Sequence, residues 1–192
     1  MPRFSRSELW ELGLAWFVLS LSFSFGSIWF GLRHFAFELA LNLLGLLTAF
    51  AGHELAHKFA AERYGCISYF RLWKIGLILA LVFSFISRGA FVFAAPGAVY
   101  FIPLYRTITR REEGIISLSG PLANLAFSLV FYSLLLLGVG GVFSYYSMKL
   151  NLWLAGFNLI PFDPLDGAKV FRWNPFIWVL AAAAAWILIF VL

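Results

Sequence analysis

The chain consists mainly of long apolar stretches separated by short polar segments. A helix that crosses a bilayer needs about 20 predominantly apolar residues. Five stretches reach or approach this length, at about residues 9–32, 35–61, 115–137, 147–160 and 175–192. The pattern therefore predicts an all-α polytopic membrane protein with five transmembrane helices.

The segment at about residues 67–103 breaks this pattern. It holds two apolar pieces of about thirteen residues, which are separated by Arg88, and the second piece contains Pro96 and Gly97. Apolar pieces of about 10–14 residues are typical of re-entrant or buried elements rather than of spans. We predict a re-entrant segment here, one that could be partly β.

Composition supports a membrane protein and argues against other classes. Hydrophobic residues make up 62% of the 192 residues and charged residues only 12%, which is far from the balance of a soluble domain. The net charge of +5 comes from scattered basic residues without a basic run, so we expect contact with the lipid bilayer and no nucleic-acid partner. We expect a single integral-membrane domain over residues 1–192, with no accessory soluble domain.

The candidate chemistry lies in the second stretch, where His53, Glu54 and His57 form an H-E-x-x-H motif. Residues four apart share one face of a helix, so both imidazoles can bind one metal ion while Glu54 lies beside the open coordination position. The alternative is a pair of packed, hydrogen-bonded histidines. We favour the metal site because ionisable groups within an apolar span are costly and usually functional.

A catalytic zinc usually takes three protein ligands and a water, so a third ligand must come from elsewhere. His34 lies about a span's length from His53, and Cys66 lies in an expected loop. Four acids next to apolar segments remain as candidates: Glu38, Glu62, Asp163 and Asp166. The last two follow a helix that prolines break, and they could line a polar cavity or simply cap a helix end at the surface. The residue pattern alone leaves these alternatives open.

Three motifs in order resemble the site-2 protease family of intramembrane zinc metalloproteases. They are His53-Glu54-Leu55-Ala56-His57, then Gly120-Pro121-Leu122-Ala123-Asn124, then Asn158-Leu159-Ile160-Pro161 leading to Asp166-Gly167. The resemblance covers about residues 35–167. It implies that Asp166 is the third ligand and that Asn158 lies by the active site, where it would hold substrate or water. It also implies that Gly120, Pro121 and Asn124 pack the neighbouring helix against the site, and that Pro161 and Gly167 shape it.

The implied activity is zinc-dependent hydrolysis of peptide bonds in or near transmembrane segments, with one Zn²⁺ per chain and Glu54 as the general base. The implied partner is a transmembrane protein substrate. Two alternatives remain open: a non-proteolytic membrane zinc protein, either a transporter or an inactive scaffold, and a membrane zinc peptidase acting on soluble or lipidated peptides. Residues 92–101 alternate small and large apolar side chains, so we expect them to offer an extended edge to an unwound substrate.

The shared ion also constrains topology. His53 and His57 lie near the end of the second span, and Asp166 lies just past the end of the fourth. Both ends must reach the same depth, so these two spans must run in the same direction. One crossing, at residues 115–137, must lie between them, and the segment at 67–103 must therefore enter the membrane and return.

The basic residues favour the same topology. Five crossings place most of them, including Arg3 and Arg6, on one side and leave Arg33 and Lys149 on the other. Cytoplasmic loops carry an excess of Lys and Arg. We therefore expect a multi-pass protein of the cell membrane, with a cytoplasmic N-terminus and an active site nearer the cytoplasmic face.

Overall fold

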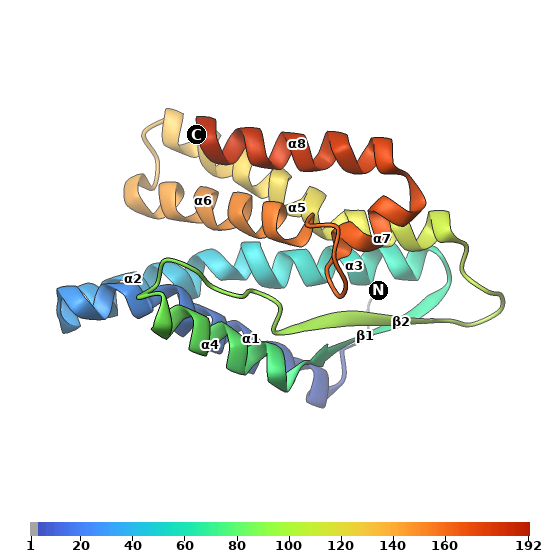
Figure 1. The fold of residues 1–192 in the computed structure, drawn as a ribbon, viewed down its shortest axis with the longest axis horizontal. Coiled ribbons are helices and arrows are strands. Elements are labelled where there is room, and N and C mark those ends of the chain that lie inside the picture. The colour runs from blue at the N-terminus through green and yellow to red at the C-terminus, as the bar shows by residue number, and fades with distance from the viewer. Residues whose placement is uncertain (1–3) are drawn as a thin grey trace.

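The computed structural model describes residues 4–192, so Arg3, which was counted among the cytoplasmic basic residues, lies outside the described part. Helices make up most of the structure, together with one small antiparallel sheet (Figure 1). In chain order the elements are α1 (Arg6–Ser24), α2 (Leu32–Leu46), α3 (His53–Arg63), β1 (Cys66–Leu72), α4 (Lys74–Ile86), β2 (Gly97–Pro103), α5 (Arg110–Leu136), α6 (Gly141–Asn158), α7 (Asp166–Trp173) and α8 (Pro175–Val191). A 3-10 turn at Phe25–Phe30 follows α1, and a π-helical turn at Leu47–Gly52 joins α2 to α3.

The helices lie side by side in layers (Figure 1). The continuous α2–α3 helix runs through the middle, with α5, α6 and α8 on one side of it and α1 and α4 on the other. Helix α6 contacts α2, α5 and α8, and α1 contacts α2 and α4. The largest apolar core lies between these layers and includes Leu19, Leu46, Phe50 and Leu154. In Figure 1, α2–α3 and α6 run in the same direction, so the ends of α3 and α6 meet at the same end of the molecule.

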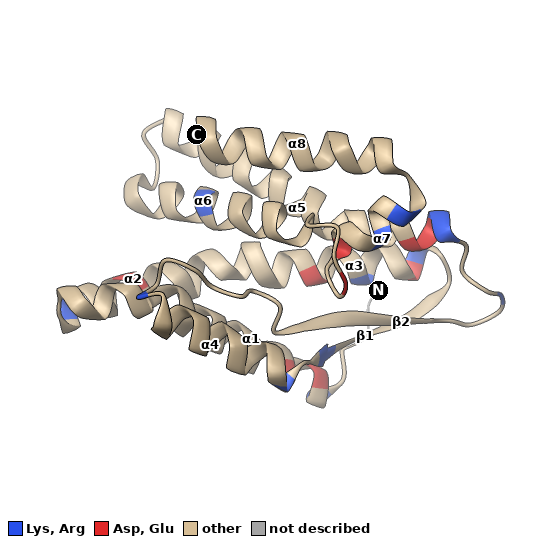
Figure 2. Ribbon diagram, viewed as in Figure 1, with Lys and Arg blue, Asp and Glu red and all other residues tan. Residues whose placement is uncertain are grey.

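Within residues 4–192, three helical segments are long and apolar enough to cross a membrane: Arg6–Phe30, Leu32–Arg63 and Arg110–Leu136. Helices α4 and α8 are shorter apolar helices, and α6 has 18 residues. The structure thus supports a membrane protein, while the count of five spans, the topology and the orientation stay predictions. Figure 2 shows Lys and Arg gathered mainly at the end of the molecule that carries α7 and the start of α5.

Two helices begin earlier than the apolar pattern predicts. Helix α5 begins at Arg110 rather than near residue 115, because Thr109 and Glu112 form a reciprocal capping box among polar residues. Helix α6 begins at Gly141 rather than near residue 147, directly after Gly138 and Gly140, whose φ angles are 73° and 77°. Hydropathy locates the apolar part of a helix. The residue at which the helix begins depends on capping side chains and on the preceding loop.

The segment at 67–103 contains a strand, a helix and a second strand. Strand β1 pairs with β2 in an antiparallel register that runs from Cys66 opposite Pro103 to Leu72 opposite Gly97. Between them α4 runs away from the sheet, and an extended stretch returns to it (Figure 1). The prediction of a partly β segment is confirmed, and the segment begins and ends at the same end of the helix layers.

Candidate metal centre

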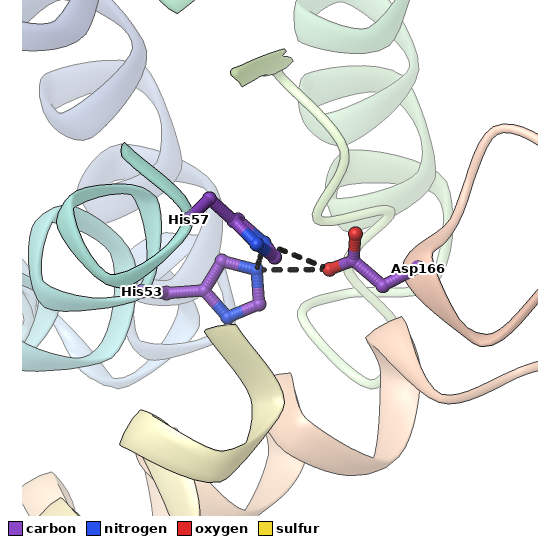
Figure 3. Close-up of side chains that lie close together, drawn as sticks. All are labelled: His53, His57 and Asp166. Atoms are coloured by element: carbon purple, nitrogen blue, oxygen red, sulfur yellow. Dashed lines mark hydrogen bonds and ion pairs between the residues drawn. The ribbon is translucent and has the colours of Figure 1, made fainter. Parts of the chain in front are cut away.

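The side chains of His53, His57 and Asp166 converge on one point (Figure 3). The two Nε2 atoms are 3.0 Å apart, and Oδ2 of Asp166 lies 3.2 Å from His53 Nε2 and 3.0 Å from His57 Nε2. Both histidines are buried, and both come from the first two turns of α3. Asp166 is the first residue of α7, which lies 109 positions after His57 in the chain.

Hydrogen bonds to the other ring nitrogens orient both imidazoles. His57 Nδ1 lies 2.8 Å from the carbonyl oxygen of Ile116, which can only accept, so this nitrogen carries the proton. His53 Nδ1 lies 2.6 Å from Oδ1 of Asn124. The amide nitrogen of Asn124 donates to the Ala49 carbonyl at 2.7 Å, which identifies the oxygen as the atom that faces His53. Both Nε2 atoms are therefore left as free lone pairs that face each other.

This donor set fits a divalent cation such as Zn²⁺. Two imidazole nitrogens and a carboxylate oxygen meet at 3.0–3.2 Å. When both rings are neutral, three such electron pairs repel unless a cation lies between them. Two ligand atoms that each lie about 2.0–2.1 Å from a tetrahedral zinc are separated by about 3.3 Å. The observed spacing is close to that value. In zinc sites, a histidine ligand usually donates its other ring N–H to an oxygen atom that fixes the orientation of the ring. The carbonyl of Ile116 and the amide oxygen of Asn124 have this place here.

Gly120 allows α5 to pass directly against the histidine pair. A β-carbon at this position would lie 2.4 Å from His57 Nε2 and 2.7 Å from His53 Cε1. Only glycine permits so close an approach. Pro121 follows it inside α5 and is buried. The predicted packing role of this motif therefore has a steric reason at Gly120 and a hydrogen-bonding one at Asn124.

Gly167 has the same relation to the end of α6. A β-carbon there would lie 2.3 Å from the carbonyl oxygen of Leu159 and 2.5 Å from that of Ile160. The start of α7 thus packs on backbone, which cannot move aside. The indole of Trp178 donates to the same Leu159 carbonyl at 2.7 Å. These contacts bring Asp166 to the depth of the histidines.

A cavity of about 450 Å³ opens beside these three side chains. Glu54, Asn158 and Lys169 line it, together with the stretch from Ala94 to Phe101. Glu54 is buried, and its Oε2 has no hydrogen-bond partner within residues 4–192. Because Glu54 lines the cavity and one of its carboxylate oxygens has no partner, this side chain is suited to hold a water molecule there.

The remaining predicted site residues behave differently from one another. The amide of Asn158 lines the cavity and donates to the Leu154 carbonyl of its own helix at 3.0 Å. Pro161 lies exposed in the turn after α6 and is not among the residues that line the cavity. Its structural effect is limited to ending α6 before the turn that leads to Asp166.

The other candidate ligands lie away from the three converging atoms. Asp163 forms a two-pronged ion pair with Arg172, at 2.7 and 3.2 Å. Glu38 lies 3.5 Å from the hydroxyl of Tyr146. Within the described residues, the group that could hold a metal contains none of His34, Glu38, Glu62, Cys66 and Asp163. Of the four candidate acids, Asp166 is the one that the structure brings to the histidines.

Sequence reasoning missed Asn151, which supports the site from α6. It accepts a hydrogen bond from Asn124 at 3.0 Å and donates to Thr48 Oγ1 at 3.1 Å. Thr48 and Ala49 belong to the π-helical turn that precedes the motif, where displaced carbonyls can accept side-chain donors. A fully buried asparagine in an apolar helix was the available signal, since it requires partners.

Comparisons with known proteins agree with this chemistry. No family model matches the chain, and no solved structure matches it. The chain is 39% identical over 182 residues to a protein named "Putative zinc metalloprotease MJ0611" from Methanocaldococcus jannaschii. The match covers 93% of this chain and 90% of that protein. It is 28% identical over 156 residues to "Putative zinc metalloprotease YwhC" from Bacillus subtilis, covering 67% of this chain and 66% of the relative. It is also 28% identical over 140 residues to "Zinc metalloprotease MJ0392" from Methanocaldococcus jannaschii, covering 69% of this chain and 34% of the relative. The extent and identity of the first match place this chain in the zinc metalloprotease family that includes MJ0611.

Proposed function

We propose that this protein is an intramembrane zinc metalloprotease of the site-2 protease kind, which hydrolyses peptide bonds in or near transmembrane segments of membrane proteins. One observation carries the proposal: two Nε2 atoms and a carboxylate oxygen converge beside the free Oε2 of Glu54, in a cavity among apolar helices. The names of the relatives support the metalloprotease part.

His53, His57 and Asp166 would hold one Zn²⁺. The bound ion would supply a Lewis acid for the scissile carbonyl and for the attacking water. Glu54 acts as the general base: its Oε2 accepts a proton from the attacking water and delivers it to the nitrogen of the leaving amine. Asn124 and the Ile116 carbonyl keep the imidazoles oriented while this proton moves. The apolar walls of the cavity exclude bulk water.

The free edge of β2 supports a site for the substrate backbone. The amides of Phe70 and Leu72 donate to glutamate side chains of α1 and so point away from β2. In an antiparallel pair of strands, two directly opposed residues behave alike. Their main-chain N–H and C=O groups either point toward the partner strand in both residues or point away from it in both. The residues opposite Phe70 and Leu72 are Val99 and Gly97, so their main-chain groups point away from β1. Val99 and Glu54 line the same cavity.

A transmembrane helix hides its carbonyls in its own hydrogen bonds, so it must unwind locally before attack. We propose that the unwound segment adds to the β2 edge as an extended strand, which would present one peptide bond beside Glu54. The five-span topology, the cytoplasmic N-terminus and a site nearer the cytoplasmic face are part of the same proposal. The gathering of Lys and Arg at the end of the molecule that carries α7 supports this orientation.

The test uses purified protein in lipid vesicles with a panel of single-span substrates. We expect cleavage by the wild type, loss of cleavage with a chelator, and recovery when zinc is restored. Glu54→Gln should bind zinc at the wild-type stoichiometry and cleave nothing, because the variant lacks a general base.

The same panel separates the alternatives. A transporter or scaffold that uses zinc predicts no cleavage of any substrate by the wild type and a Glu54→Gln variant that keeps its function. A peptidase for soluble or lipidated peptides predicts that peptides without a span are cleaved as fast as the spanning substrates. The first result would overturn the protease function, and the second would overturn the proposed substrate class.

A further inference from the structure

Lys58, which directly follows His57 on α3, is 1% exposed. Its Nζ donates to Oε1 of Glu8 at 2.6 Å and to the Ser68 carbonyl at 2.8 Å, and it lies 4.6 Å from the centre of the Phe4 ring. A buried ammonium is costly unless it has partners, and here it has two hydrogen-bond acceptors and an aromatic ring. The lysine thus joins the motif helix to α1 and to β1.

Glu8 completes this junction from the first turn of α1, where it is 4% exposed. The oxygen that binds Lys58 also accepts the amide of Phe70 at 3.0 Å. One turn later, Glu11 accepts the amide of Leu72 at 2.8 Å. Three main-chain groups of β1 that point away from β2 are therefore satisfied by side chains of α1 and α3.

This arrangement leaves one open edge on the sheet. An unpaired strand edge is a template for another strand, and a substrate could add to either side of a bare hairpin. A strand added to β1 would lie three strand spacings, or about 14–15 Å, from the position of a strand added to β2 beside Glu54. Glu8 and Glu11 occupy the β1 edge and so leave the edge next to Glu54.

We explain the buried Glu8–Lys58 ion pair by its effect on the position of the hairpin and not by a gain in stability. A buried ion pair is often no more stabilising than apolar side chains of the same volume. Its directed hydrogen bonds, however, fix the hairpin at one height along α3. Lys58 follows His57 by one residue, so the same helix turn sets the positions of the metal ligands and of the hairpin.

We propose that Glu8 and Lys58 are positioning residues that lock the β1–β2 hairpin against α3, so that a substrate on β2 meets Glu54 in a single register. This inference rests on the proposed protease function. Loss of the lock lets the hairpin slide or open, and the cleavage position then spreads over neighbouring peptide bonds. No step of the chemistry involves either residue.

The test is the double variant Glu8→Leu/Lys58→Met, which leaves neither charge buried alone. Its zinc content should equal that of the wild type. Mass spectrometry of the products should find one dominant cleavage position for the wild type and two or more adjacent positions for the variant, with a larger change in KM than in kcat. The Phe70 amide should exchange with solvent at least about tenfold faster, because it has lost its acceptor.

Arg71→Gln is the matched control. It breaks the exposed Arg71–Glu11 ion pair on the same strand and leaves Glu8 and Lys58 in place, so cleavage should stay at one position. If the double variant does not fold, Glu8→Gln serves, because it keeps an acceptor for Phe70 but weakens the hold on Lys58, and the cleavage positions should spread less far.

Two results separate failure of the lock from failure of the proposed function. A folded, zinc-bound variant with the wild-type cleavage position and unchanged amide exchange would overturn the lock alone. A wild type that cleaves no substrate would overturn the protease function. In that case the exchange rate of the Phe70 amide still decides whether the ion pair holds the hairpin.

Discussion

Gly120 of α5 faces His57 of α3 so closely that a β-carbon at position 120 would lie 2.4 Å from the Nε2 atom. This nitrogen is one of the two imidazole nitrogens that converge with Oδ2 of Asp166. The helix that carries the second motif therefore forms a wall of the candidate metal centre, and a side chain at position 120 would collide with the histidines.

Gly120→Ala should weaken zinc binding by about 10–100-fold, because the added methyl group displaces both imidazoles from their common point. Competition with a chromogenic chelator measures this affinity. Gly13→Ala is the control: position 13 of α1 has open space around it, so zinc affinity should not change. Unchanged affinity in Gly120→Ala would mean that the two helices separate without affecting the ligands.

Replacement of Asn124 tests the orientation of His53. Asn124→Leu removes the acceptor of the Nδ1 proton, so we expect zinc affinity to fall by about 10–100-fold. Asn124→Asp keeps that acceptor and loses the donors to Ala49 and Asn151, so it should retain more affinity than the leucine variant. The reverse order of the two variants would assign the effect to helix packing instead.

The two neighbouring aspartates should differ sharply. Asp166→Asn removes a charged oxygen from the converging atoms, and we expect the zinc stoichiometry after dialysis to fall well below one per chain. Asp163→Asn breaks a surface ion pair with Arg172 and should leave the stoichiometry unchanged. Elemental analysis of both purified variants decides the question, and equal losses would refute the assignment of the third ligand.

The Asp163–Arg172 pair should also produce a small pH dependence of stability. The neighbouring guanidinium holds the pKa of Asp163 below its usual range. A carboxyl with a lowered folded-state pKa stabilises the protein above its unfolded-state pKa, and this contribution disappears as the pH falls through the folded-state value. Asp163→Asn should therefore lower the melting temperature slightly at neutral pH, and the difference from wild type should vanish in acid. A difference that stays constant over this range would mean that the ion pair does not contribute.

Substrate contact with the β2 edge can be tested by crosslinking. A photoreactive residue at Val99 or Ala94 should crosslink to substrate trapped on the inactive Glu54→Gln variant, since both positions line the cavity. The same probe at the exposed Ile67 of β1 is the control and should give little product. Trapped complexes without crosslinks at either cavity position would remove β2 from the substrate path.

The chain order of the motifs was enough to predict much of the site. The spacing of His53 and His57 places two imidazoles on one helical face, which is a local property of any helix. Asp166 came from the resemblance to a family, because the residue pattern alone left four acids open. The interrupted apolar segment at 67–103 likewise predicted a departure from simple spans, since strand signals and short apolar pieces are local.

Contacts between residues far apart in the chain could be identified only from the tertiary structure. The bond from His53 to Asn124 joins residues 71 positions apart, and the ion pair of Lys58 with Glu8 joins residues 50 positions apart. Hydrophobic periodicity reports which face of an element is buried and not which polar group lies opposite it. The sequence by itself therefore determined the chemistry that could occur, through the residue types and their helical spacing. Only the packing of α3, α5 and α7 decided which polar atoms meet, because side chains far apart in the chain acquire a fixed distance only when the helices that carry them pack together.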